Sequence, residues 1–63
     1  MIVTKKVSLE LVGLDGNAYN LMGTFIRQAR VENWTEEEID EVITECKSSD
    51  YDHLLATLIA HTR

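Results

Sequence analysis

Hydrophobic and polar residues alternate along the first part of the chain, from Val3 to Val12. The apolar side of this alternation is formed by Val7, Leu9 and Leu11. A period of two is typical of a half-buried β-strand. Because a single strand leaves its backbone hydrogen-bonding groups unpaired, we expect one of two arrangements. Either residues 2–5 fold back as a short hairpin arm, or the strand pairs with its copy in a second chain. We prefer the second arrangement, because association also stabilises so small a domain, and it predicts a homodimer through Val3–Val12.

Three later segments repeat apolar residues at steps of three and four, the period of an amphipathic helix. The first helix is expected over about Ala18–Val31, with Asn17 as its N-cap. The second begins with a capping box, Thr35–Glu38, and ends near Lys47. The third, with Ser49 as its expected cap, runs close to the C-terminus. The predicted fold class is α+β, with one N-terminal β-strand followed by three α-helices in a single small domain, residues 1–63.

All three glycines lie between Gly13 and Gly23, where the expected strand meets the first helix. Asp15-Gly16 is a turn dipeptide, and we expect it to reverse the chain there. A phosphate-binding loop is disfavoured, because the third glycine of the dinucleotide fingerprint and the lysine of the P-loop are lacking. Gly23 falls inside the expected helix, where glycine costs on the order of 1 kcal/mol relative to alanine. Either another element packs closely against Gly23, or Gly23 is the floor of a groove that a ligand or a partner backbone approaches.

Charge is unevenly distributed along the chain, whose formal net charge is -5. Residues 32–52 hold nine carboxylates and a single lysine. This balance disfavours nucleic-acid binding and suits a basic protein partner, or mimicry of nucleic acid toward a DNA-binding protein. A solvated face that keeps a small protein soluble is the alternative. The expected outward face of the second helix carries the candidate partner-binding residues Glu37, Asp40, Glu41 and Glu45.

An exposed aromatic edge is the second candidate binding surface. It would involve Tyr19, Trp34 or Tyr51, and the alternative for these rings is the core, because a chain of 63 residues buries little surface. Self-association would also help so small a domain, since the one cysteine, Cys46, closes no internal disulfide. A free cysteine fits a reducing compartment, which predicts a cytoplasmic protein. No apolar run reaches the length of a membrane span, so we expect no membrane partner.

Catalytic and metal-binding residues are not predicted. Cys46, Asp52 and His53 supply the residue types of a thiol enzyme, but Cys46 lies on the apolar stripe of the second helix, where a cysteine behaves as a small buried hydrophobe. The histidines His53 and His61 are eight residues apart, which places them on different sides of a helix. We therefore expect no enzyme activity, no cofactor and no metal.

Two resemblances bear on function. A strand followed by helices resembles the ribbon-helix-helix repressors, in which Lys6, Ser8 and Glu10 would face DNA bases, although a negative net charge opposes DNA binding. Four segments carry a second resemblance: DGNAY at residues 15–19, LMG at 21–23, WTEEEI at 34–39 and SDYDHLL at 49–55. Over roughly residues 7–60 the chain is similar to a family of small uncharacterised proteins of bacteria, phages and other mobile elements. That resemblance implies a microbial or phage setting and supplies no functional residues.

The predicted function is recognition of a protein partner by a non-enzymatic interaction or regulatory protein. The alternatives are a dimeric DNA-binding regulator of the ribbon-helix-helix kind and an acidic mimic of nucleic acid.

Overall fold

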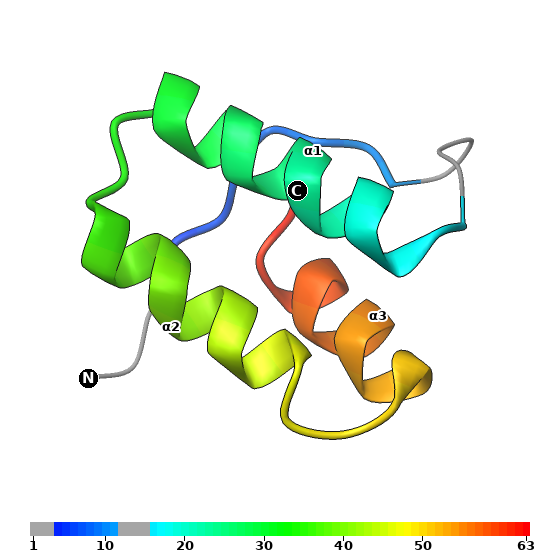
Figure 1. The fold of residues 1–63 in the computed structure, drawn as a ribbon. Coiled ribbons are helices and arrows are strands. Elements are labelled where there is room, and N and C mark those ends of the chain that lie inside the picture. The colour runs from blue at the N-terminus through cyan, green and yellow to red at the C-terminus, as the bar shows by residue number, and fades with distance from the viewer. Residues whose placement is uncertain (1–3, 12–15) are drawn as a thin grey trace.

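The computed structural model describes residues 4–11 and 16–63, and these residues form three helices. Helix α1 spans Ala18–Val31, α2 spans Glu36–Cys46 and α3 spans Tyr51–Ala60 (Figure 1). The extended N-terminal segment, residues 4–11, passes alongside α1 and meets the last residues of the chain. None of the helices in the described part of the chain has the length and apolarity needed to cross a membrane.

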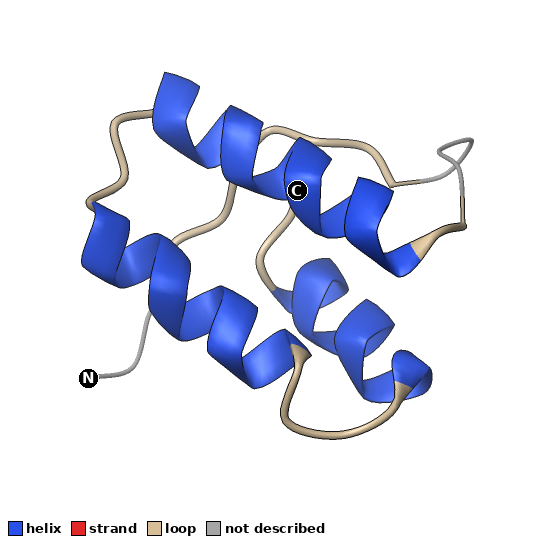
Figure 2. Cartoon of the chain, viewed as in Figure 1, coloured by secondary structure: helices blue, strands red, loops and turns tan. Residues whose placement is uncertain are grey.

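The predicted N-terminal strand is wrong for the residues that the structure describes. Residues 4–11 contain no strand (Figure 2), and the fold is all-helical over the described ranges instead of α+β. Only an isolated parallel bridge joins Val7 to Thr62. Val3 and Val12, the ends of the expected strand, lie outside the described residues, and so does part of the hairpin arm expected over residues 2–5. Gly13 and Asp15 of the expected turn also lie outside them.

The physical reason is that residues 4–11 pair with the chain terminus that follows α3, and not with a second strand. The amide of Val7 donates to the carbonyl oxygen of His61 at 2.8 Å, and the amide of Arg63 donates to the carbonyl oxygen of Val7 at 3.0 Å. A bend at Ser8 brings the amide of Leu9 to 3.1 Å from the carbonyl oxygen of Val7, which ends the extended run. The apolar positions of the segment therefore pack on helices.

The starts of α1 and α2 confirm the predicted caps. The Asn17 side chain accepts hydrogen bonds from the amides of Tyr19, at 2.9 Å, and Asn20, at 3.4 Å. Thr35 Oγ1 accepts from the amide of Glu38 at 3.1 Å, while the Glu38 carboxylate accepts from the amide of Thr35 at 2.9 Å. Both orphan donors of the α2 capping box are thus satisfied.

Helix α3 begins one residue later than the expected Ser49 cap would place it. Asp50 is the N-cap, and its carboxylate accepts from the amide of His53 at 3.0 Å. A carboxylate at this position also lies at the positive end of the helix dipole, which favours it over a serine hydroxyl. The C-cap of α2 is Lys47, as the sequence predicts.

The core lies where the three helices and residue 7 meet, and Phe25, Leu58, Val7 and Cys46 are its largest fully buried side chains. Trp34 is also buried, only 7% exposed, and its ring stands edge-on to that of Phe25 with centroids 5.5 Å apart. Trp34 therefore follows the core alternative and does not belong to an exposed aromatic edge. Trp34 follows a tight turn at Asn33, whose φ is 67°, and this turn directs the indole inward.

Candidate functional site

A groove of about 390 Å³ lies at the corner where the start of α1 meets the connection between α2 and α3. Two of the three aromatic residues predicted to form a binding edge line this groove. Tyr19 is 80% exposed and Tyr51 is 44% exposed, although they are far apart in the sequence. The fold therefore brings together two exposed aromatic side chains whose separation in the sequence does not predict that they meet.

The walls and floor of the groove are mainly apolar. Met22 and Leu54, from the core faces of α1 and α3, line it together with Ala18 and Cys46. A volume of about 390 Å³ falls in the range of ligand pockets, and an apolar lining suits one or two apolar side chains of a binding partner.

Tyr51 is held in place by a hydrogen bond that links the start of α3 to the segment before α1. Its hydroxyl donates to the carbonyl oxygen of Gly16. A Cβ added to Gly16 would lie 3.5 Å from the Tyr51 hydroxyl oxygen, an ordinary contact. The Tyr51 ring is thereby fixed, while Tyr19, on the first turn of α1, projects into solvent.

The charged residues of the groove lie on the side of the α2–α3 connection. Asp50 lines the groove, and Asp52 follows on the exposed first turn of α3. Glu45 lies nearby on α2, where one of its carboxylate oxygens is 2.6 Å from His53 Nε2. Lys47 is the cation that lines the groove beside them. The charged side chains that line the groove are thus one carboxylate and one cation, while Glu45 and Asp52, the sequence neighbours of the lining residues Cys46 and Tyr51, add negative charge that would favour a cationic partner.

Cys46 lines the groove but is built as a core residue. It is 1% exposed, and burial, together with the negative charge of Glu45, raises the pKa of its thiol to about 11. The thiolate is the nucleophilic form of cysteine, and this environment disfavours it. The His53 ring bonds to Glu45, which is consistent with the predicted structural role of Cys46.

The acidic face predicted on α2 is divided by the structure. Glu37, Asp40 and Glu45 are exposed, whereas Glu41 is half-buried. Glu45 is engaged by His53 and Ser48 at the C-terminal end of the helix. Glu37 and Asp40 form the exposed acidic part at the N-terminal end, well away from the groove that Cys46 and Lys47 line.

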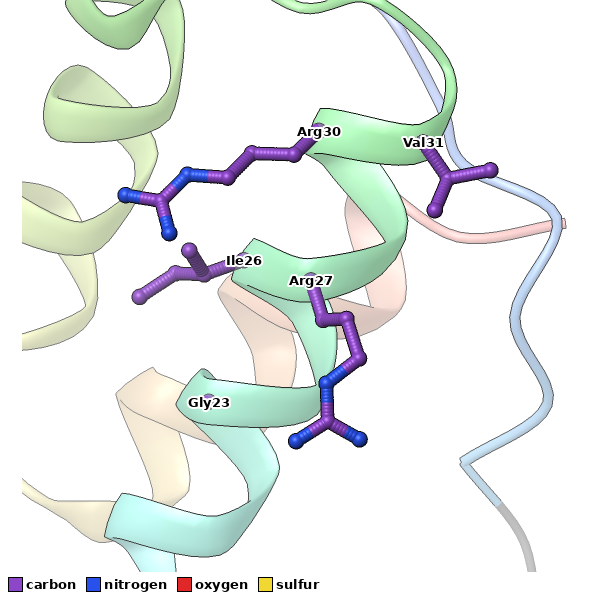
Figure 3. Close-up of a pocket in the computed structure, with 5 residues that line it drawn as sticks. All are labelled: Gly23, Ile26, Arg27, Arg30 and Val31. Atoms are coloured by element: carbon purple, nitrogen blue, oxygen red, sulfur yellow. The ribbon is translucent and has the colours of Figure 1, made fainter.

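Gly23 lies on the outer face of α1, and the close packing that the sequence suggested as one explanation is wrong. Among the residues that the structure describes, a Cβ added there would meet nothing within 4 Å. Gly23 instead lines a shallow hollow of about 560 Å³, in keeping with the alternative of an open groove (Figure 3). The rest of the hollow was missed at the sequence level, although a second stripe of helical spacing signals it: Ile26, Arg27, Arg30 and Val31.

Within residues 4–11 and 16–63, no three His, Cys, Asp or Glu side chains gather closely enough to hold a metal ion. Comparisons with protein-family models, with curated proteins and with solved structures gave no match. The resemblance to small bacterial and phage proteins therefore stays a prediction.

Proposed function

We propose that the chain is a non-enzymatic protein-recognition module that binds a basic, amphipathic segment of a partner protein in the groove between Tyr19 and Tyr51. The observation that carries this proposal is the convergence of two exposed tyrosines on one apolar groove. Tyrosine is one of the residues enriched at the anchor positions of protein interfaces. A chain this small has few such rings, so leaving two of them exposed at the same place favours an interface.

The charge of the rim defines the chemistry of the partner. Asp50 lines the groove and Asp52 follows Tyr51 in the sequence, within a stretch that carries most of the net negative charge, and this charge favours lysine or arginine residues on the partner. An apolar partner side chain would enter between the tyrosine rings, and flanking cations would face these carboxylates. The proposed location is the cytoplasm, because a free buried cysteine suits a reducing compartment.

The alternative functions differ in what supports them. A ribbon-helix-helix regulator requires a strand, and residues 4–11 form none, so we do not propose it. An acidic mimic of nucleic acid would use the exposed carboxylates without the tyrosine groove, and it stays a prediction. The test below separates a mimic from a groove binder, because only the groove binder depends on Tyr19.

Selection of binders from a random peptide library against the full chain tests the proposal. We expect selected peptides to share a central leucine, phenylalanine or tryptophan flanked by lysine or arginine. Tyr19→Ser should weaken their binding at least about tenfold, since loss of an aromatic anchor costs more than about 1.4 kcal/mol. Because Tyr19 is 80% exposed, its replacement should leave the fold intact.

Ile59→Ser is the matched control, because Ile59 is 62% exposed on α3 and does not line the groove. It removes an exposed apolar side chain elsewhere, and binding should not change. Equal binding to the native chain and to Tyr19→Ser would overturn the groove proposal. Basic peptides that bind without an apolar centre and ignore Tyr19→Ser would favour the acidic mimic.

A further inference from the structure

The outer face of α1 carries a second helical stripe, and one of its members, Ile26, also packs against the core. Its members recur at i, i+3, i+4, i+7 and i+8, the spacing of a contiguous helix face: Gly23, Ile26, Arg27, Arg30 and Val31. Val31 is 68% exposed and Ile26 is half-buried. In Figure 3, Ile26 and Arg30 extend to one side of α1 and Arg27 and Val31 to the other, with the bare turn at Gly23 next to them.

Gly23 leaves one turn of this stripe without a side chain, and packing among the described residues does not require that. Nothing in the described structure would meet its added Cβ, so packing among the described residues does not account for the glycine. A helix interior tolerates glycine at a cost of about 1 kcal/mol. Absence of a side chain at this turn lets the backbone of another helix approach closely, as small residues do at other helix interfaces.

The outer face of α2 carries an exposed stripe of opposite charge at the i, i+3 and i+7 positions of this spacing. It begins at Glu37 and includes Asp40 and Thr44, all exposed. The outward stripes of α1 and α2 cannot meet within one chain, because the two helices contact each other through their buried faces. The Arg30 guanidinium is 3.1 Å from the Glu36 carboxylate of its own chain. Among the described residues no carboxylate lies within ion-pair distance of Arg27.

We propose that the α1 stripe of one copy binds the α2 stripe of a second copy, with Arg27 facing Asp40. Because the two stripes carry opposite charges at matching helical positions, we take the partner to be a second copy of this chain. A two-fold contact of α1 with α1 would instead bring four arginines together, and one of α2 with α2 would bring carboxylates together. When each copy uses its two stripes on two different neighbours, the contact is head-to-tail and lets copies add to either end.

The contact is weak, and its strength sets the conditions of measurement. The stripe from Gly23 to Val31 spans about 12 Å of helix, which places the buried area at the low end of protein interfaces. The net charge of -5 on each copy also opposes association at long range. At about 0.15 M salt, charges more than about 8 Å apart are screened, while close ion pairs are screened less. Association should appear at chain concentrations of about 0.1–1 mM.

Sedimentation velocity of the full chain, with circular dichroism to check the fold, tests the proposal. The native chain should show a mass above that of the monomer, and Arg27→Glu should return it to the monomer. Asp40→Lys should do the same, even though it lowers the net negative charge. The double variant R27E/D40K restores the native net charge and the complementary pair, and it should restore association.

Glu10→Lys is the control for charge alone, because Glu10 is exposed on residues 4–11 and belongs to neither stripe. It makes the same charge change as Asp40→Lys and should leave association in place. A native chain that stays monomeric at 1 mM would overturn the proposal. Stronger association of Asp40→Lys than of the native chain would also overturn it, because net charge would then control self-association. Association that neither single variant changes would overturn it as well, because another surface would then be used.

Discussion

The amide of Val7 donates to the carbonyl oxygen of His61 at 2.8 Å, and this bond joins the N-terminal segment to the turn that follows α3. Both residues make further contacts. Val7 is fully buried, and the His61 ring lies edge-on to Trp34 while its Nδ1 is 2.9 Å from the carbonyl oxygen of Lys5. The two ends of the described chain therefore close the helical core together, in the place where a strand pair was expected.

Truncation of Val7 should destabilise the whole domain. Val7→Ala removes two fully buried methyl groups and should lower the free energy of unfolding by about 2 kcal/mol. For a domain of this size that is a large share of the total stability. The measurement is chemical denaturation followed by circular dichroism. Val31→Ala is the matched control: Val31 is 68% exposed, so the same change there should alter stability by less than about 0.5 kcal/mol. Similar losses in the two variants would mean that residue 7 is not buried in solution.

The carboxylate of Glu32 should make stability depend on acid pH. It accepts hydrogen bonds from Gln28 Nε2 at 2.9 Å and from the Ser8 amide at 2.7 Å, and it lies 3.4 Å from the Arg63 guanidinium. The hydrogen bonds from Gln28 and Ser8, and then Arg63, lower the pKa of Glu32 below its usual 4.5. A lowered pKa favours the folded state at pH above about 4.5, and this contribution is lost as the pH falls through the folded pKa.

We therefore expect the melting temperature of Glu32→Gln to lie below that of the native chain at pH 7, and the difference to shrink toward pH 3. Glu38 also makes stability fall at acid pH, in the native chain and in Glu32→Gln alike, because hydrogen bonds from the Thr35 amide and from Lys5 lower the pKa of its carboxyl. Glu37→Gln, on the exposed face of α2, is the control and should keep the native profile. A constant difference between Glu32→Gln and the native chain across this pH range would contradict the predicted role.

The helices could be predicted from the sequence because each carries its own local signals. The capping box at Thr35 and the cap at Asn17 act through bonds within one helical turn, and the apolar period needs no knowledge of the partner element. The N-terminal segment carries no such local information. Alternation at Val7, Leu9 and Leu11 is equally compatible with a strand and with an extended segment lying on helices. Its hydrogen-bonding partner, the end of the chain after α3, has no strand pattern.

The candidate site could be predicted only residue by residue. Tyr19 and Tyr51 were identified as aromatic candidates, but their meeting at one groove depends on how α1 and α3 pack. Trp34 belonged to the same candidate set and is buried, because the turn at Asn33 decides which way it faces. The predicted homodimer stays a prediction, now without the strand that motivated it.

Cys46 should be inert toward thiol reagents in the folded chain. With its thiol pKa raised from 9.0 to about 11, the thiolate fraction near pH 8 is about a hundredfold lower than in the unfolded chain, and burial also excludes the reagent. Reaction with a chromogenic disulfide should therefore be at least about a hundredfold slower than in denaturant. A chain carrying Thr44→Cys and Cys46→Ala is the control, since residue 44 is exposed and should react rapidly. Rapid reaction of native Cys46 would reopen the thiol chemistry that the structure disfavours.

Gly23→Ala should stabilise the chain. The space around residue 23 is open and the turn is helical, so alanine adds no clash and gains about 0.5–1 kcal/mol of helix propensity. Gly23→Ser should give a smaller gain, because serine is a weaker helix former than alanine. Denaturation of the two variants at low micromolar concentration, where the proposed self-association is negligible, isolates this effect on the single chain. If both substitutions lower stability instead, something packs against this turn within the chain, and the open hollow at Gly23 does not exist in solution.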